Sequence, residues 1–448
     1  MFQKVLIANR GEIAVRIIQA CRDLGIISVA VYSEADREAL HAQIADEAVC
    51  IGPARAAESY LNMDNIISAA LASGCQAIHP GFGFLSENPD FAERATQAGL
   101  AFIGPTAATI RLMGDKSEAK RNAIAAGVPV ALGTDGPLRD FDEAISEAER
   151  IGYPVMLKAA SGGGGKGIRV ALSVKDLKDA YDSAAAEAVA NFGDGRLYME
   201  KYIHNPRHIE VQILGDSLGN VVHLFERECS VQRRHQKLIE ECPSAFVTPE
   251  LREKMTSAAV ALAKRVGYRS AGTIEFLVDN DRNFYFCEMN TRIQVEHPVT
   301  EQVTGVDLVC EQLRIAAGEP ISFKQEDLVM RGHAIECRIN AEDPSRNFAP
   351  CPGTLVSLHL PGGPGVRVDS AAYQGYKIPP FYDSMIGKLI VYGSDRTQAI
   401  DRMRRALAET LFEGVVTGTD YQMHILCSKA FVDANFNVNS IANGDFDQ

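Results

Sequence analysis

Two glutamates occupy matching positions on either side of a short polar loop, Asn280–Asn283. The flanking runs are rich in β-branched and aromatic residues, and they predict a β-hairpin. Counting back from a four-residue loop pairs Leu277 with Phe286 and then Glu275 with Glu288, whose Cβ atoms would lie ~5 Å apart on one face. Carboxylates that close repel each other unless a cation lies between them. The hairpin therefore predicts a divalent metal site.

Polar side chains continue beyond this hairpin on the same face. Asn290 comes two residues after Glu288, and this set of carboxylate and amide oxygens suits Mg²⁺ or Mn²⁺, which would also hold nucleotide phosphates. Arg292, Gln294 and Glu296 follow at alternate positions, which an extended chain places on one side. An acidic pair facing solvent at a sheet edge is the alternative, and the polar continuation weakens it. We expect these side chains to line one side of a catalytic site.

A run of glycines in the string SGGGGKG, residues 161–167, lies between predicted strands at 154–157 and 168–171. Glycine N–H groups can wrap phosphate oxygens because no Cβ blocks a concave backbone. The run lacks the Ser or Thr that follows Gly-Lys in a P-loop, and it does not open a helix as a dinucleotide-binding fingerprint does. A flexible hairpin tip would explain the glycines equally well, but Lys158 and Lys166 favour a lid over phosphates.

The elements that must position these residues begin with βαβ alternation. Short apolar strands are predicted at residues 4–8, 28–32, 77–79 and 101–103. A helix is predicted over 12–24, and this alternation indicates a parallel sheet covered by helices. A linker-like stretch follows Pro105, and Thr248 before Pro249 predicts the N-cap and first residue of a later helix.

Composition excludes several classes of function. The 58 acidic residues outnumber the 45 basic ones, and the net charge of −13 argues against nucleic-acid binding. No stretch approaches the ~20 apolar residues of a membrane span, and the apolar run Val5–Ala8 is too short for a signal peptide. The ten cysteines form no C-x-x-C pair, so neither structural zinc nor a disulfide framework is expected. We expect a cytoplasmic protein, or one of the matrix or stroma after removal of a transit segment.

Nine strings follow one another along the chain: IANRGEIAVRI (7–17), HPGFGFLSEN (79–88), MGDK (113–116), SGGGGKG (161–167), MEKY (199–202), CSVQRRHQK (229–237), EMNTRIQVEHPVTE (288–301), GHAIECRINAEDP (332–344) and PPFYDSMIGKL (379–389). In these strings, and over residues 1–448, the chain resembles biotin carboxylase, a member of the ATP-grasp superfamily. The sixth string would on its own be typical of a solvated loop. Family members usually have Tyr where Phe82 stands, and residues 414–418 lack the usual Lys and Asn.

The resemblance implies a multidomain α/β and α+β fold. It would comprise a Rossmann-like N-terminal parallel sheet, an ATP-grasp lid and core, and a mixed C-terminal domain. The implied bounds are 1–113 for the N-terminal domain, 114–130 for a linker, 131–201 for the lid, 202–330 for the core and 331–448 for the C-terminal domain.

The resemblance also implies an activity, that of an ATP-dependent ligase. The enzyme would carboxylate biotin with bicarbonate through carboxyphosphate, giving ADP and phosphate, and would use two Mg²⁺ or Mn²⁺ ions. Because the chain contains no Met-Lys-Met attachment site, biotin would arrive on a separate biotin carboxyl carrier protein. Carboxyltransferase subunits would be further partners, and a homodimer is implied.

Each matching side chain acquires an implied role. ATP would be held by Lys116, Lys158, Gly163, Gly164, Gly165, Lys166, Gly167, Glu200, Lys201, Ile203, His208, Gln232, His235 and Leu277. The metal ions would be bound by Glu275, Glu288 and Asn290. Bicarbonate would be held by Lys237, Arg292, Gln294 and the Val295 backbone. Glu296 would be the general base, Arg338 would pair with the biotin ureido oxygen, Lys237 and Arg292 would join them in catalysis, and Phe82 would contact biotin.

Alternatives remain at this point. The chain would most naturally serve acetyl-CoA carboxylase in fatty acid synthesis, but propionyl-CoA and pyruvate carboxylases use similar subunits. Another ATP-grasp ligase, such as a purine-pathway carboxylase or a carbamoyl-phosphate synthetase domain, would share the glycine lid and acidic hairpin. A catalytically silent scaffold is disfavoured because every proposed ligand is present. A Rossmann dehydrogenase is excluded because residues 8–11 supply no dinucleotide fingerprint.

Overall fold

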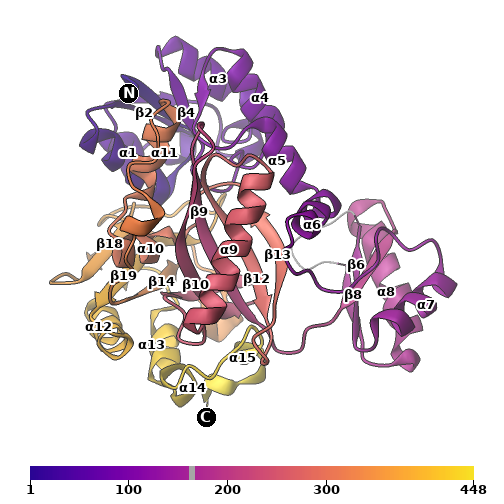
Figure 1. Ribbon diagram of the computed structural model, residues 1–448. Coiled ribbons are helices and arrows are strands. Elements are labelled where there is room, and N and C mark those ends of the chain that lie inside the picture. Colours follow the sequence, from indigo (N-terminus) through magenta and orange to yellow (C-terminus); the bar gives the residue numbers. More distant parts are fainter. Residues whose placement is uncertain (161–166, 448) are drawn as a thin grey trace.

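The computed structural model describes residues 1–160 and 167–447 of the chain (Figure 1). Gly163, Gly164, Gly165 and Lys166, all predicted to bind ATP, lie outside the described residues. Within the part of the chain that is described, none of the helices combines the length and the apolar composition that crossing a bilayer requires.

The N-terminal region forms a five-stranded parallel sheet with the strand order β3-β2-β1-β4-β5. Its strands are β1 (Lys4–Ile7), β2 (Ile27–Tyr32), β3 (Glu47–Cys50), β4 (Ala77–His79) and β5 (Ala101–Phe102). The predicted parallel sheet is confirmed, and the four predicted strands agree within one residue at each end. The sequence pattern misses β3, because this edge strand is largely exposed and shows no apolar run.

Helix α1 (Gly11–Asp23) follows β1, as predicted, and it is buried along most of its length. Its apolar residues, among them Ile13 and Ile17, join one hydrophobic core with Leu313 of α11 (Leu308–Ala316). Glu12, in the first turn of α1, lies 3.5 Å from Lys388 of β19 (Met385–Gly393), a strand outside the N-terminal sheet. The first turn of α1 is therefore enclosed between the N-terminal region and the rest of the molecule.

The stretch after Pro105 is helical, so the expectation of a linker-like segment is wrong there. Helices α5 (Ala107–Gly114) and α6 (Lys116–Ala125) follow each other with only one residue between them. Their contact with the core is made partly by small side chains, such as Ala119 and Ala123 in α6. Alanines give a weak apolar pattern, which is why the sequence does not suggest a packed helix.

A small antiparallel sheet, ordered β7-β6-β8, projects to one side of the molecule (Figure 1). Its strands are β6 (Val155–Ala159), β7 (Ile168–Ala171) and β8 (Leu197–Lys201), and helices α7 (Phe141–Ile151) and α8 (Val174–Phe192) accompany them. The helices and strands share a hydrophobic core of their own. We call this unit the lid.

An eight-stranded antiparallel sheet, ordered β13-β12-β9-β10-β11-β14-β19-β18, forms the centre of the molecule. Its strands are β9 (Arg207–Gly215), β10 (Val221–Arg233), β11 (Gln236–Cys242), β12 (Ser270–Val278), β13 (Phe284–Asn290), β14 (His333–Asn340), β18 (Val366–Ser370) and β19 (Met385–Gly393). Strand β11 pairs with β14, so residues predicted as two domains, 202–330 and 331–448, share one continuous sheet.

Of the remaining elements, α2 (Leu40–Ile44), α3 (Met63–Ala72) and α4 (Pro89–Gln97) pack with the N-terminal sheet, and the others belong to the central and C-terminal parts of the molecule. Helix α9 (Pro249–Arg265) begins after Thr248, whose Oγ1 accepts a hydrogen bond of 3.3 Å from the Leu251 N–H, and this confirms the predicted cap. The rest are α10 (His297–Thr304), β15 (Glu342–Asp343), β16 (Ala349–Pro350), β17 (Ser357–His359), α12 (Arg396–Glu409), β20 (Leu411–Glu413), α13 (Thr419–Cys427), α14 (Lys429–Val432) and α15 (Ser440–Asn443).

Candidate active site

A cleft of about 1770 Å³ is lined by residues of the N-terminal region, the lid and the central sheet. It collects the predicted site residues that come from distant parts of the sequence: Phe82, Lys116, Lys158, Glu200, Lys201, Ile203, His208, Gln232, His235, Lys237, Glu275, Leu277, Glu288, Asn290, Arg292, Gln294, Val295, Glu296 and Arg338. One cavity therefore contains both the proposed nucleotide ligands and the proposed acid-base residues.

The two glutamates of the hairpin pair directly across β12 and β13, as predicted. Glu275 is buried, whereas Glu288 is exposed within the cleft. The pKa of Glu288 is raised, because desolvation and the negative charge of Glu275 both disfavour its ionised form. A carboxylate pair of this kind suits a bound cation.

The length of the loop and the pairing of the residues next to it differ from the prediction. The loop has five residues, Asp279–Asn283, and Leu277 pairs with Tyr285 instead of Phe286. A register shift between Glu275 and the next residue of β12 then restores the predicted partner of Glu275. The correct glutamate pair thus results from two errors that cancel.

The oxygens of Glu275 are surrounded by donors. Its Oε1 accepts hydrogen bonds from Asn290 Nδ2 at 2.8 Å, Gln294 Nε2 at 2.9 Å and Lys237 Nζ at 3.1 Å. Its Oε2 lies 3.1 Å from His208 Nε2. Burial would raise the pKa of Glu275, but the charges of Lys237 and His208 hold it well below the usual value. In turn Glu275 overcomes the burial of His208 and raises the pKa of that imidazole to about 9.

The positively charged ammonium of Lys237 is surrounded by three carboxylates. Its Nζ lies 2.7 Å from Glu210 Oε2 and 2.6 Å from Glu296 Oε1, in addition to its contact with Glu275. Glu210 is fully buried and is absent from the predicted set. It stands two residues after His208 in β9, so strand alternation, which puts both on one face, was the available signal.

Arg338 of β14 contacts two buried carboxylates. Its Nε donates to Glu240 Oε1 at 2.6 Å, and its Nη2 donates to Glu296 Oε2 at 2.9 Å. Burial raises the pKa of Glu240 to about 7 despite the charge of Arg338. Burial would also raise the pKa of Glu296, but Lys237 and Arg338 outweigh it and the pKa is lowered. Glu296 is therefore an ionised carboxylate between two cations.

Arg227, which the sequence reasoning missed, fixes the orientation of Gln294. Its guanidinium is fully buried, and its Nη2 donates to Gln294 Oε1 at 2.8 Å. The other acceptors of Arg227 are Glu210, Gln212, Thr273 and Thr300. With its oxygen engaged in this way, the Gln294 amide directs its nitrogen to Glu275.

The string around Phe82 supports the cleft from the N-terminal side. Glu87 Oε2 accepts a hydrogen bond of 2.8 Å from Arg292 Nε, and Asn290 Oδ1 accepts one of 2.9 Å from Arg292 Nη2. The carbonyl of Phe82 accepts one of 2.8 Å from Asn9 Nδ2. Glu87 was missed, because only the fold brings it to Arg292.

The lid side of the cleft is rich in lysine. Lys158 Nζ lies 2.5 Å from Glu200 Oε2, and Lys120 Nζ lies 3.2 Å from Glu200 Oε1. Lys201 Nζ donates a hydrogen bond of 2.9 Å to the Gly152 carbonyl, so this ammonium connects β8 to the end of α7 within the lid. Gly167 has φ +72°, and a Cβ there would lie 2.9 Å from the Ala159 Cβ.

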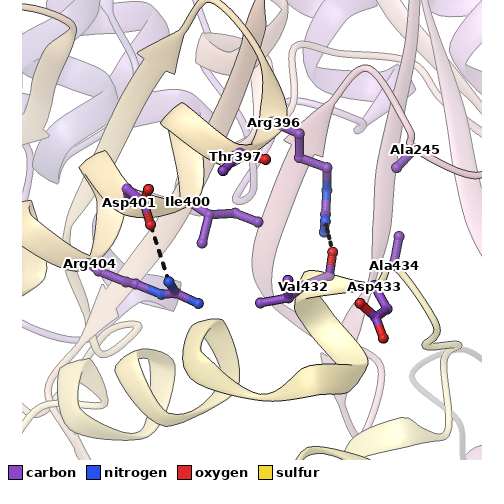
Figure 2. A pocket seen from close by; sticks show the side chains of 9 residues that line it. All are labelled: Ala245, Arg396, Thr397, Ile400, Asp401, Arg404, Val432, Asp433 and Ala434. Atoms are coloured by element: carbon purple, nitrogen blue, oxygen red, sulfur yellow. Dashed lines mark hydrogen bonds and ion pairs between the residues drawn. The ribbon is translucent and has the colours of Figure 1, made fainter.

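A second, smaller pocket of about 350 Å³ lies beside α12 and α14 (Figure 2). Arg396 donates to the Val432 carbonyl there, and Arg404 pairs with Asp401. Arg396 also forms an ion pair with the buried Glu241 of β11. None of the predicted site residues lies in this pocket, and each of its charged side chains has an ion-pair partner, in the pocket or beside it.

Three family models match the chain. They are the N-terminal domain of biotin carboxylase over residues 1–110, the ATP-binding domain of the carbamoyl-phosphate synthase L chain over 115–324, and the C-terminal domain of biotin carboxylase over 336–443.

Individual relatives match along almost the whole chain. Biotin carboxylase 1 of Bacillus subtilis is 55% identical over 446 residues, covering 99% of each chain. A pyruvate carboxylase subunit of Methanothermobacter thermautotrophicus is 56% identical over 431 residues, covering 96% of this chain and 88% of the relative. A solved dimer of the biotin carboxylase domain of Hydrogenobacter thermophilus 2-oxoglutarate carboxylase, in complex with MgADP, ADP and bicarbonate, is 52% identical with a TM-score of 0.94, covering 100% of this chain and 99% of that one.

Proposed function

Since the chain belongs to the biotin carboxylase family, an ATP-dependent class of ligase, we propose that it carboxylates biotin carried on a biotin carboxyl carrier protein. Bicarbonate and ATP would be the other substrates, and ADP and phosphate the products. The position of Glu296 carries this proposal. Its two carboxylate oxygens contact Lys237 at 2.6 Å and Arg338 at 2.9 Å, so a base lies between the cations proposed for the two reactants.

Bicarbonate would bind beside Lys237, Arg292, Gln294 and the Val295 N–H. Glu296 would accept its proton, and the lowered pKa of Glu296 means that the carboxylate is ionised and ready to do so. The bicarbonate oxygen would then attack the γ-phosphoryl group of ATP, giving carboxyphosphate and ADP. Catalysis of this transfer depends on positioning and on cations along the phosphates.

Glu275, Glu288 and Asn290 fit a divalent metal site. The raised pKa of Glu288 reflects a negative charge that its surroundings disfavour, and a cation would relieve this repulsion. Two bound Mg²⁺ or Mn²⁺ ions would neutralise charge on the nucleotide phosphates. Asn290 Nδ2 keeps Glu275 in place at 2.8 Å.

The nucleotide would occupy the lid side of the cleft. Lys116, Lys158, His208 and Gln232 would hold phosphates and ribose, with His235 and Gly167 nearby. Gly163, Gly164, Gly165 and Lys166 would be further ATP ligands and lie outside the described residues. Glu200, Lys201, Ile203 and Leu277 would surround the adenine. The Lys158–Glu200 ion pair of 2.5 Å means that phosphates would compete with a carboxylate for this ammonium.

Biotin would be carboxylated at the opposite side. Carboxyphosphate would collapse to CO₂ and phosphate, and the phosphate would take the N1′ proton of biotin. The ureido oxygen then becomes negative, and the fixed charge of Arg338 would stabilise it. Phe82 lines the cleft and would offer a ring face to biotin, without the hydroxyl of the usual Tyr.

Steady-state ATP hydrolysis tests this proposal. We expect hydrolysis that depends on bicarbonate and that free biotin stimulates, together with transfer of labelled bicarbonate to biotin. Hydrolysis that ignores both compounds but responds to another carboxylate substrate would indicate a different ATP-grasp ligase.

The final acceptor is a second question. We propose that the chain performs the first half-reaction of acetyl-CoA carboxylase, in the cytoplasm and as a homodimer, with the domain bounds stated above except that α6 occupies most of the stretch expected to be a linker. The relative named for pyruvate carboxylase, at 56% identity, favours pyruvate as the alternative acceptor. Co-purification with the biotinylated carrier and the carboxyltransferase, followed by assays with acetyl-CoA, propionyl-CoA and pyruvate, distinguishes them.

A further inference from the structure

The buried ammonium of Lys388 in β19 points at the backbone of residues 294–296, which are proposed to bind bicarbonate. Its side chain has 0% exposure, and its Nζ donates a hydrogen bond of 2.6 Å to the Val295 carbonyl. The nearest acidic oxygens are farther away, at 3.5 Å for Glu12 Oε1 and 4.0 Å for Asp369 Oδ2. The shortest contact of Lys388 is therefore with a neutral peptide group of the cleft wall.

The acids around Lys388 keep it charged. Burial would lower the pKa of this ammonium, but Glu12, Glu336 and Asp369 outweigh it and the pKa is raised. These acids come from α1 and from β14 and β18, the two strands that pair with β19 in the central sheet. Among the described residues, neither oxygen of Glu12 finds a hydrogen-bond partner. Glu12 thus supplies charge to Lys388 without holding the segment itself.

His297 holds the neighbouring peptide group. His297 is the first residue of α10, and its Nδ1 lies 2.7 Å from the carbonyl of Gln294, three residues earlier. Burial and the positive charges of Lys388, Arg16 and Arg367 lower the pKa of this imidazole well below its usual value, so the ring is neutral. A neutral ring facing a carbonyl must carry its proton on Nδ1 and donate it.

The carbonyls of Gln294 and Val295 therefore each accept a side-chain hydrogen bond, the first from His297 and the second from Lys388. The Gln294–Val295 peptide is trans, so the Val295 N–H points away from the carbonyl that His297 binds. Within residues 1–160 and 167–447, no group accepts a hydrogen bond from this N–H. A donor bound to the carbonyl of a peptide also polarises the N–H at its other end.

We propose that Lys388 and His297 are positioning residues that hold the Val295 N–H and the Glu296 carboxylate in the geometry for bicarbonate. The inference rests on the proposed function of this cleft. Neither side chain touches the substrate. Both act through the backbone of residues 294–296, one from the central sheet and one from α10.

Lys388→Met combined with Glu12→Gln tests the first residue, because the second change removes the nearer of its two paired acids, Glu12 at 3.5 Å, which would otherwise lose its cation. We expect the KM for bicarbonate to rise about tenfold or more, as for the loss of a hydrogen bond to a charged group. ATP affinity, measured by calorimetry, should stay unchanged. Glu12→Gln alone is the matched control and should keep the wild-type KM.

His297→Asn and His297→Leu test the second residue and decide the matter if the Lys388 variant fails to fold. Asparagine places an N–H near the position of Nδ1, whereas leucine removes the side-chain donor and leaves only the backbone N–H of residue 297, which lies 3.3 Å from the same carbonyl. We expect His297→Leu to raise the KM for bicarbonate and His297→Asn to restore it.

A folded variant with an unchanged bicarbonate KM, or one that loses ATP affinity in parallel, would overturn the inference. Absence of bicarbonate-dependent hydrolysis in the wild-type protein would instead overturn the proposed function.

Discussion

Replacing Arg338 by alanine removes a cation of the cleft wall that contacts two buried glutamates, Glu240 at 2.6 Å and Glu296 at 2.9 Å. If Arg338 stabilises the negative ureido oxygen, its loss should reduce the rate of biotin carboxylation far more than the binding of ATP. Removing one preorganised donor of this kind costs about 10²–10³ in kcat. We expect a loss of that size with an unchanged nucleotide affinity.

The same change should also affect stability. Leaving a buried carboxylate without its partner costs about 3–5 kcal/mol. The cost should be smaller below neutral pH, because the pKa of Glu240 is already about 7 and the unpaired carboxyl can take a proton. Urea denaturation at two pH values measures this difference, and circular dichroism shows whether the variant is folded in the rate assay.

Arg396→Ala is the matched control. Arg396 pairs with Glu241, which follows Glu240 in β11. The side chain of Arg396 is 15% exposed, against 16% for Arg338. It lines the second pocket (Figure 2) and does not line the cleft. The control should lose stability but keep its carboxylation rate. Near-normal carboxylation in folded Arg338→Ala, or an equal rate loss in both variants, would refute the role of Arg338.

Three further predictions concern the metal site, pH and the helix cap. Glu288→Gln should raise the Mg²⁺ concentration for half-maximal ATP hydrolysis by about tenfold or more, and an unchanged metal titration would contradict its role as a ligand. Burial raises the pKa of Glu12 from 4.5 to about 7, so the folded state retains a proton that the unfolded state loses and stability falls as pH rises between these values. Glu12→Gln should remove about 3 kcal/mol of that fall in urea denaturation at pH 4.5 and 7.5, and an equally steep fall in the variant would count against the burial effect. Thr248→Ala should lower the free energy of unfolding by ~1 kcal/mol by removing the cap of α9, and thermal unfolding that matches the wild type would show that the cap is dispensable.

The sequence predicts the parts of the fold that depend on local patterns. The apolar strands β1 and β4 and the cap at Thr248 are examples, because burial and turn chemistry leave clear signals at those positions. The helices after Pro105 are not predicted, since alanines such as Ala119 pack well without forming an apolar stripe.

The candidate site divides in the same way. Residues on one strand face, such as Glu275 and its cross-strand partner, follow from alternation and pairing. Glu87 and Lys388 do not, because only the tertiary fold brings them to Arg292 and Val295 across gaps of 205 and 93 residues. Arg227 is missed for a similar reason, as its five acceptors become neighbours only when four segments meet.

The pairing of β11 with β14 has a consequence for how the molecule can be divided. A cut after residue 330 would leave Glu240 and its neighbours on a bare strand edge in one piece and Arg338 on a bare edge in the other. Unpaired edges of this kind invite association with other chains. We therefore expect the parts before and after residue 330 to unfold together, because Arg338 contacts Glu296 only when β11 and β14 are paired.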